Sequence, residues 1–156
     1  MTDFDYMELA LELARQAADE GDIPVGALIT DEEGVVIGRG RNRRRLESDP
    51  TAHAEIVAIR EAAQHLKSWN LSGCTLYVTL EPCPMCAGAI IQSRLSRVVY
   101  GCADPKAGAC GTLYNIAKDN RLFHRADVTA HVMEEECREI LQDFFLKCRK
   151  KNRVKR

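Results

Sequence analysis

The chain has 156 residues, of which 46% are hydrophobic and 29% charged, a balance that fits one globular domain over 1–156. The opening residues, MTDFDYMELALELA, lack the basic and apolar regions of a secretory signal, and no apolar run is long enough to span a bilayer. Seven cysteines is an odd number, and in a chain without a secretory signal it disfavours a disulfide framework. We therefore expect a cytoplasmic protein, not a membrane protein or a secreted disulfide-bonded one.

The net charge is only -1, but acidic and basic residues are unevenly distributed. Residues 1–33 carry ten acids against the single base Arg15. Residues 149–156 form a basic C-terminal tail with six lysines or arginines. A second basic cluster consists of Arg39, Arg41, Arg43, Arg44 and Arg45. Two such patches predict local binding of a polyanion.

In chain order, hydrophobic spacing first predicts a helix over 4–20, followed by a β-hairpin with strands over 25–30 and 35–40. The polar run RNRRRLESDP then predicts a loop that closes on Pro50. Thr51 can cap the helix that comes next. The apolar residues expected to pack inward from this helix are Ile56, Val57, Ile59 and Ala63.

A strand is predicted over 75–80, a helix with Pro84 in its first position comes next, and a strand follows over 97–101. This order implies a parallel pair of strands with a helix across one face. The remaining predicted elements are a glycine-rich loop over 104–111, a short helical stretch over 113–117, a strand over 128–132 and an amphipathic helix over 134–150. Together they predict a three-layer α/β domain, with helices on both faces of a mixed sheet of about five strands.

Two short segments, each at the start of a predicted helix, carry the candidate chemistry: His53-Ala54-Glu55 and Pro82-Cys83-Pro84-Met85-Cys86. A CxxC pair at a helix start directs two sulfurs toward one point, and the positive helix end favours the thiolate that a metal requires. Two thiolates and one imidazole suit Zn²⁺. Three ligands leave a tetrahedral ion with one open position, which is typical of a catalytic site.

Glu55 is two positions from His53, and side chains so spaced can face one pocket only in the first turn of a helix. There the carboxylate can take a proton from zinc-activated water and return it to a ring nitrogen and then to departing ammonia. Plainer alternatives stay open. Glu55 is also a residue that the helix dipole favours at this position, His124 or His131 could close a structural zinc site, and a redox role for the CxxC pair is a minor possibility.

The HxE and PCxxC motifs resemble those of the cytidine and nucleotide deaminase superfamily. Finer features resemble the bacterial tRNA adenosine deaminases (TadA) over nearly the whole chain: IPVGALIT at 23–30, Asn42, DPTAHAE at 49–55, TLYVTLEPCPMCAGAI at 75–90, DPKAGACGTL at 104–113 and DFF at 143–145. The resemblance implies a cytidine deaminase-like α/β/α fold and hydrolytic deamination of adenosine to inosine at the wobble position of a tRNA anticodon. It also implies a homodimer that binds the anticodon stem-loop and holds one zinc ion per subunit.

The resemblance assigns roles residue by residue, with His53, Cys83 and Cys86 as zinc ligands and Glu55 as the catalytic acid–base. Asn42 is expected to hydrogen-bond a flipped purine. The further residues expected to contact the purine or the RNA are Ile23, Asp104, Lys106, Phe145 and Arg149. Their plainer alternatives are core packing for the isoleucine and phenylalanine, a turn for the aspartate and a solvated charge for the terminal arginine.

Two other functions remain open on the sequence alone. The metal motif fits a deaminase of free nucleobases or nucleosides, such as guanine or cytosine, equally well, although that activity has no need of a basic tail. A non-catalytic, zinc-stabilised RNA-binding module is the second, and Glu55 together with the open coordination position argues against it. The cysteines outside the motif are expected to be ordinary reduced side chains: Cys74, Cys102, Cys110, Cys137 and Cys148.

Overall fold

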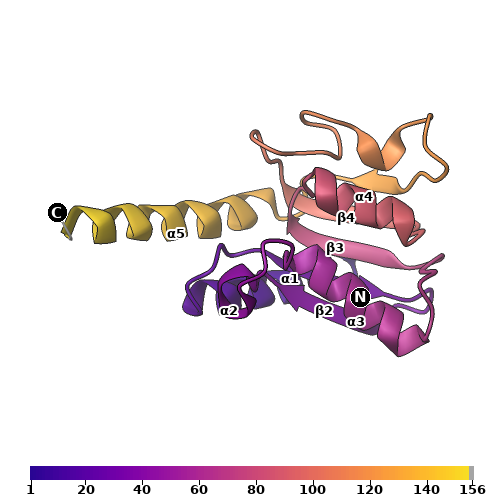
Figure 1. Ribbon diagram of the computed structural model, residues 1–156, viewed down its shortest axis with the longest axis horizontal. Coiled ribbons are helices and arrows are strands. Elements are labelled where there is room, and N and C mark those ends of the chain that lie inside the picture. The colour runs from indigo at the N-terminus through magenta and orange to yellow at the C-terminus, as the bar shows by residue number, and fades with distance from the viewer. Residues whose placement is uncertain (155–156) are drawn as a thin grey trace.

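The computed structural model describes residues 1–154, and Figure 1 shows the course of the chain. The elements are α1 (Asp3–Asp19), β1 (Gly26–Thr30), β2 (Val36–Arg41), α2 (Arg44–Glu47), α3 (Ala54–Leu66), β3 (Thr75–Leu80), α4 (Pro84–Gln92), β4 (Arg97–Cys102), the 3-10 helix η1 (Ile116–Lys118), β5 (Asp127–Thr129) and α5 (Glu134–Val154). The strands form one mixed sheet in the order β2-β1-β3-β4-β5. β1 is antiparallel to both β2 and β3, whereas β3, β4 and β5 run parallel.

Helices cover both faces of this sheet and bury a separate hydrophobic cluster on each, which confirms the predicted three-layer arrangement (Figure 1). On one face, α3 and α4 pack through small and aliphatic side chains such as Ala58 and Ile90. On the other, α1 contributes Met7 and Leu11, and the first turn of α5 contributes Cys137. Ile140 and Leu141 of α5 still pack against this cluster, and the C-terminal part of α5 extends away from the sheet in Figure 1.

The buried face of α3 is a stripe of alanines at four-residue spacing, Ala54, Ala58 and Ala62. It lies against glycines of β2, and the fit is close. A Cβ atom at Gly40 would overlap the Ala54 carbonyl oxygen and lie 2.7 Å from the Ala58 nitrogen. Glycine is therefore required at this position because helix backbone occupies the space of a side chain.

The predicted inward face of α3 is wrong in part, and the close contact with β2 explains why. Ile56 and Val57 are only partly buried, because a strand carrying glycine admits nothing larger than alanine at the interface. Ile59 and Ala63, the other two residues predicted to face inward, pack against the core from partly buried positions.

The segment predicted as a simple loop before α3 also differs from expectation. It contains the short helix α2, and the Thr51 hydroxyl donates to Asp49 instead of capping α3. The N–H of Ala54 donates to the side-chain oxygen of Asn42, 2.9 Å away, so the cap comes from the end of β2. Twelve residues separate the two partners, which is why the local pattern did not identify them.

The C-terminal elements match the prediction in type but not in extent. η1 replaces the short helical stretch expected over 113–117, and β5 has only three residues. α5 continues to Val154, past the predicted end at residue 150. Residues 155–156 of the predicted basic tail lie outside the described residues. Among the helices of residues 1–154, none has the length and apolar character needed to cross a bilayer.

The Gly40→Ala substitution tests the close contact between α3 and β2. We expect it to lower the free energy of unfolding by about 1–3 kcal/mol, the usual cost of overpacking, because backbone atoms must move to admit the methyl group. Gly88→Ala in α4 is the matched control, since a Cβ there meets nothing within 4 Å and should leave stability unchanged or slightly raised. Chemical denaturation measures both, and equal stability of the two variants would contradict the prediction.

Candidate active site

Three candidate metal ligands meet where the first turns of two helices converge. His53 is the N-cap of α3, Cys83 is the N-cap of α4, and Cys86 follows in the first turn of α4. The Nδ1 atom of His53 lies 3.6 Å from each of the two sulfurs. Pro84 occupies the first position of α4, where a missing N–H costs nothing, and so starts the helix directly after the first sulfur.

The spacing of these donor atoms fits a tetrahedral zinc ion. Bond lengths of about 2.3 Å to sulfur and about 2.0–2.1 Å to nitrogen place neighbouring ligand atoms about 3.5 Å apart. The two nitrogen–sulfur separations in the structure are 3.6 Å. All donor atoms of the cluster lie within 4.8 Å of one another. The two histidines considered as a fourth ligand have other partners, since His124 Nε2 donates to the Leu95 carbonyl and His131 lies beside Glu134.

The electrostatics of the cluster favour a metal-binding thiolate. The hydrogen bond from Cys86 and the neighbouring His53 lower the pKa of the Cys83 thiol to about 4. The same hydrogen bond, together with burial, raises the pKa of Cys86. Hydrogen bonding to Cys83 raises the pKa of His53. The Cys83 thiolate thus faces the Cys86 thiol and the His53 ring, and a cation bound among them would be stabilised by its charge.

Glu55 lies in the first turn of α3 and lines the same cavity as His53 and Cys83. The residue is only 4% exposed, and this burial raises the pKa of its carboxyl group to about 7. A carboxyl group with a pKa near neutrality can both accept and donate a proton under physiological conditions. His53 and Glu55 thus line one cavity from the start of α3, as the sequence predicted.

This cavity, which we call the site cavity, has a volume of about 170 Å³. Its lining residues are Ile23, Val25, Asn42, Arg44, His53, Glu55, Leu80, Glu81, Cys83, Asp104 and Ala107. Pockets for drug-sized molecules have volumes of about 300–1,000 Å³. The site cavity can therefore hold one small ring system, while the remainder of a larger substrate would lie outside.

Asn42 lines the site cavity, and its side-chain amide makes two hydrogen bonds within the protein. Its Nδ2 donates to the Ile23 carbonyl at 3.0 Å, and its Oδ1 accepts the N–H of Ala54 at 2.9 Å. One N–H of the amide and one lone pair of the oxygen remain for a ligand. The two internal bonds fix the orientation of the amide, so Asn42, directly after β2, joins the segment before β1 to the start of α3 beside the cavity.

Of the other residues predicted to contact RNA, only some lie at the site cavity. Asp104 lines the site cavity, and its Oδ1 accepts the backbone N–H groups of Lys106 and Ala107, as a turn residue would. Lys106 is exposed on the same loop but does not line the cavity. Phe145, 46% exposed, and Arg149 lie in the second half of α5 and do not line the cavity.

Glu81 is a site residue that the sequence reading missed. Its side chain is buried, and its carboxylate accepts the backbone N–H groups of Asp104, Cys110 and Thr112, each at 3.1 Å, as well as the Thr112 hydroxyl. One carboxylate directly after β3 thus holds the whole 104–112 loop against the site cavity. The available signal was an acidic residue in an otherwise apolar strand end, TLEPC, with no local partner.

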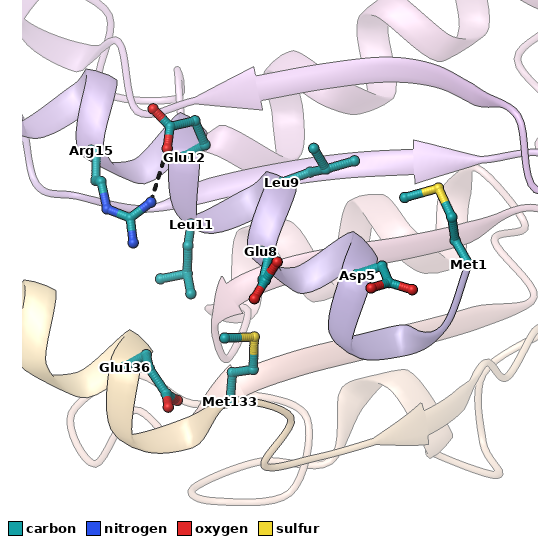
Figure 2. A pocket seen from close by; sticks show the side chains of 9 residues that line it. All are labelled: Met1, Asp5, Glu8, Leu9, Leu11, Glu12, Arg15, Met133 and Glu136. Carbon is teal, nitrogen blue, oxygen red and sulfur yellow. Dashed lines mark hydrogen bonds and ion pairs between the residues drawn. The ribbon is translucent and has the colours of Figure 1, made fainter.

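A second, wider cavity lies on the opposite face of the sheet and contains none of the predicted site residues. It has a volume of about 740 Å³ between α1 and the start of α5. Figure 2 shows that the carboxylates of Asp5, Glu8 and Glu136 surround it, with Met1 and Met133 among them. Nothing in it resembles the donor set of the site cavity.

Comparison with known proteins agrees with this geometry. Residues 1–149 match the model of the MafB19-like deaminase family. The chain is 46% identical to a tRNA-specific adenosine deaminase of Bacillus subtilis (strain 168), over 97% of this chain and 93% of the relative. It is similar to a solved structure from a study of A-to-I editing by tRNA:A34 deaminases at the wobble position of transfer RNA, with a TM-score of 0.84 and 44% identity over 88% of this chain and 99% of the other.

A solved guanine deaminase from Bacillus subtilis is also similar, though less closely. The TM-score is 0.65 and the identity 38%, over 72% of this chain and 71% of the other. The relationship therefore extends to deaminases of free bases, and both substrate types have to be tested.

The Glu81→Gln substitution tests how the 104–112 loop is held. The new amide group has to face at least one N–H donor of the loop, so we expect the free energy of unfolding to fall by about 1–3 kcal/mol and amide exchange at Cys110 and Thr112 to accelerate. Glu61→Gln, an exposed carboxylate of α3, is the control and should change neither quantity. Unaltered exchange in the Glu81 variant would show that the loop does not depend on this carboxylate.

Proposed function

This chain belongs to the tRNA-specific adenosine deaminase family, and on that basis we propose that it converts adenosine to inosine at the wobble position of a tRNA anticodon by hydrolysis. The single observation that carries the proposal is the placement of a buried glutamate with a pKa near 7 beside three potential metal ligands in a cavity sized for one base. The homodimer implied by the family resemblance and a cytoplasmic location are part of the same proposal.

The proposed cofactor is one zinc ion per subunit, held by His53, Cys83 and Cys86. The donor spacing and the lowered pKa of the Cys83 thiol support this assignment. Zinc in such a site supplies the Lewis acidity that activates water at neutral pH. The remaining chemistry falls to side chains of the chain itself.

Glu55 is proposed to move the protons. Its carboxylate accepts a proton from the attacking water and delivers it to a ring nitrogen of the purine. It then takes the second proton from the new C6 hydroxyl and delivers it to the amino group, which leaves as ammonia while the C6 carbonyl of inosine forms. This is the established chemistry of zinc nucleobase deaminases as a class. Burial supports the assignment, because a group with a pKa of about 7 exchanges protons in both directions near neutral pH.

The substrate base is proposed to flip out of the RNA and enter the site cavity, leaving the sugar and phosphates outside. There Ile23 would contact the ring, and the free N–H of Asn42 would donate to its edge. Asp104 and Lys106 would contact the flanking nucleotides. The exposed face of α5, with Phe145 and Arg149, would support the anticodon stem-loop.

The substitutions Glu55→Ala and Cys83→Ala separate the proposed proton carrier from the proposed metal site. We expect Glu55→Ala to keep one zinc ion per chain and to bind RNA, while kcat falls by about 100- to 10,000-fold, the usual contribution of general acid–base catalysis. Cys83→Ala should lose the metal as well as the activity. Metal analysis and single-turnover kinetics measure both effects, with Glu61→Ala as the control on the same helix. Normal deamination by the Glu55 variant would refute the acid–base assignment.

The substrate itself is tested by product analysis. Incubation with an anticodon stem-loop carrying adenosine at the wobble position should yield inosine, detected by nuclease digestion and chromatography. Free adenosine, guanine and cytosine should remain unchanged, because the family resemblance and the basic residues of α5 favour a polyanionic substrate. Release of ammonia from guanine with the RNA unchanged would instead identify a free-base deaminase.

A further inference from the structure

Arg44, the first residue of α2, lines the site cavity together with His53 and Glu55. Among the described residues that line this cavity it is the sole lysine or arginine. Its side chain is 37% exposed, so the guanidinium stands between the cavity and solvent. Sequence patterns alone gave no reason to separate Arg44 from its arginine neighbours, whereas its position does.

The guanidinium of Arg44 forms an ion pair with a buried carboxylate. The Nε atom of Arg44 lies 3.6 Å from Oδ1 of Asp22, a side chain only 3% exposed. Asp22 also accepts the N–H groups of Ile23 and Arg45, and so ties the wall of the cavity to α2. The Nε atom is buried without a hydrogen bond, while the side chain as a whole is 37% exposed, so its accessible part includes the outer Nη end. Its Nη groups are therefore available to a ligand.

Building on the proposed function, we propose that Arg44 binds a phosphate that flanks the reacting adenosine. A base held in the site cavity carries its sugar and adjoining phosphates at the mouth, where Arg44 stands. The carboxylates at the cavity, Glu81 and Asp104 among them, would repel a phosphate. The planar fork of a guanidinium can bind two phosphate oxygens at once, which makes arginine suited to this role.

The cations next to the cavity are consistent with a nucleic-acid strand at this position. Arg45, the next residue of α2, lines a groove of about 610 Å³ together with Lys147 and Lys151 of α5. α2 therefore presents one arginine to the site cavity and the following one to a basic groove. A polyanion whose base occupies the cavity would meet both.

Arg43 offers a matched comparison. Its side chain is also 37% exposed, and its Nε lies 3.6 Å from a carboxylate oxygen of Glu47, the same separation as in the Arg44 pair. It carries the same charge one position earlier in the chain but does not line the site cavity. A general electrostatic effect of the arginine cluster would affect both residues equally, whereas a specific phosphate contact would affect only Arg44.

The experiment compares wild type, Arg44→Gln, Arg44→Lys and Arg43→Gln on the anticodon stem-loop and on two analogues. In each analogue one phosphate flanking the reacting adenosine is an uncharged methylphosphonate. Arg44→Gln should raise KM for the unmodified RNA about tenfold with kcat nearly unchanged, as expected for loss of a charge-assisted hydrogen bond that is not specific to the transition state. Arg44→Lys should recover part of the loss, and Arg43→Gln should remain within twofold of wild type.

One methylphosphonate should raise KM about tenfold for wild type and for Arg43→Gln, but should cause no further loss for Arg44→Gln, because the contact it removes is already absent. Losses that multiply at both linkages, or an unchanged KM in Arg44→Gln, would overturn the role of Arg44 while leaving tRNA deamination intact. If wild type deaminates free guanine and leaves RNA unchanged, the proposed function fails, and the phosphate contact fails with it. Zinc content and the free energy of unfolding of each variant show that folded enzymes are being compared.

Discussion

The close packing of α3 on the glycines of β2 is the constraint on which the site depends. With no side chain at Gly40, the backbone of the first turn of α3 approaches the strand directly, and that turn carries His53 and Glu55. A helix held at ordinary distance by larger side chains would carry both residues away from the cysteines of α4. The position of His53 relative to the two cysteines therefore depends on the lack of a side chain at Gly40.

Buried polar groups complete what this packing begins. Asn42 accepts the first free N–H of α3 and donates to the Ile23 carbonyl, while Glu81 satisfies three backbone N–H groups and a hydroxyl of the 104–112 loop. Buried donors and acceptors are costly when unpaired, so each of these side chains admits few alternative arrangements of its neighbours. Both side chains line the site cavity, next to Glu55 and the candidate metal ligands.

The sequence predicted much of this molecule because its strongest signals are local. Period-two and period-3.6 patterns gave the helices and strands, and motif spacing gave His53, Cys83 and Cys86, which the structure brings within contact of one another. Glu81 and Arg44 were missed for the opposite reason. Their partners lie far along the chain or in a cavity that forms only on folding. The alanine face of α3 was misread because aliphatic side chains look like the core until the glycines opposite them are known.

Because Glu81 holds the 104–112 loop mainly through backbone groups, the backbone course of the loop does not depend on all of its side chains. The carboxylate binds main-chain N–H groups and one threonine, so the side chains of Pro105 and Lys106 contribute nothing to these bonds. Residues at those positions can be exchanged while the loop keeps its course beside the cavity. Substitutions at these two positions are therefore a way to change which nucleotides are preferred beside the target base while the backbone of the loop stays the same.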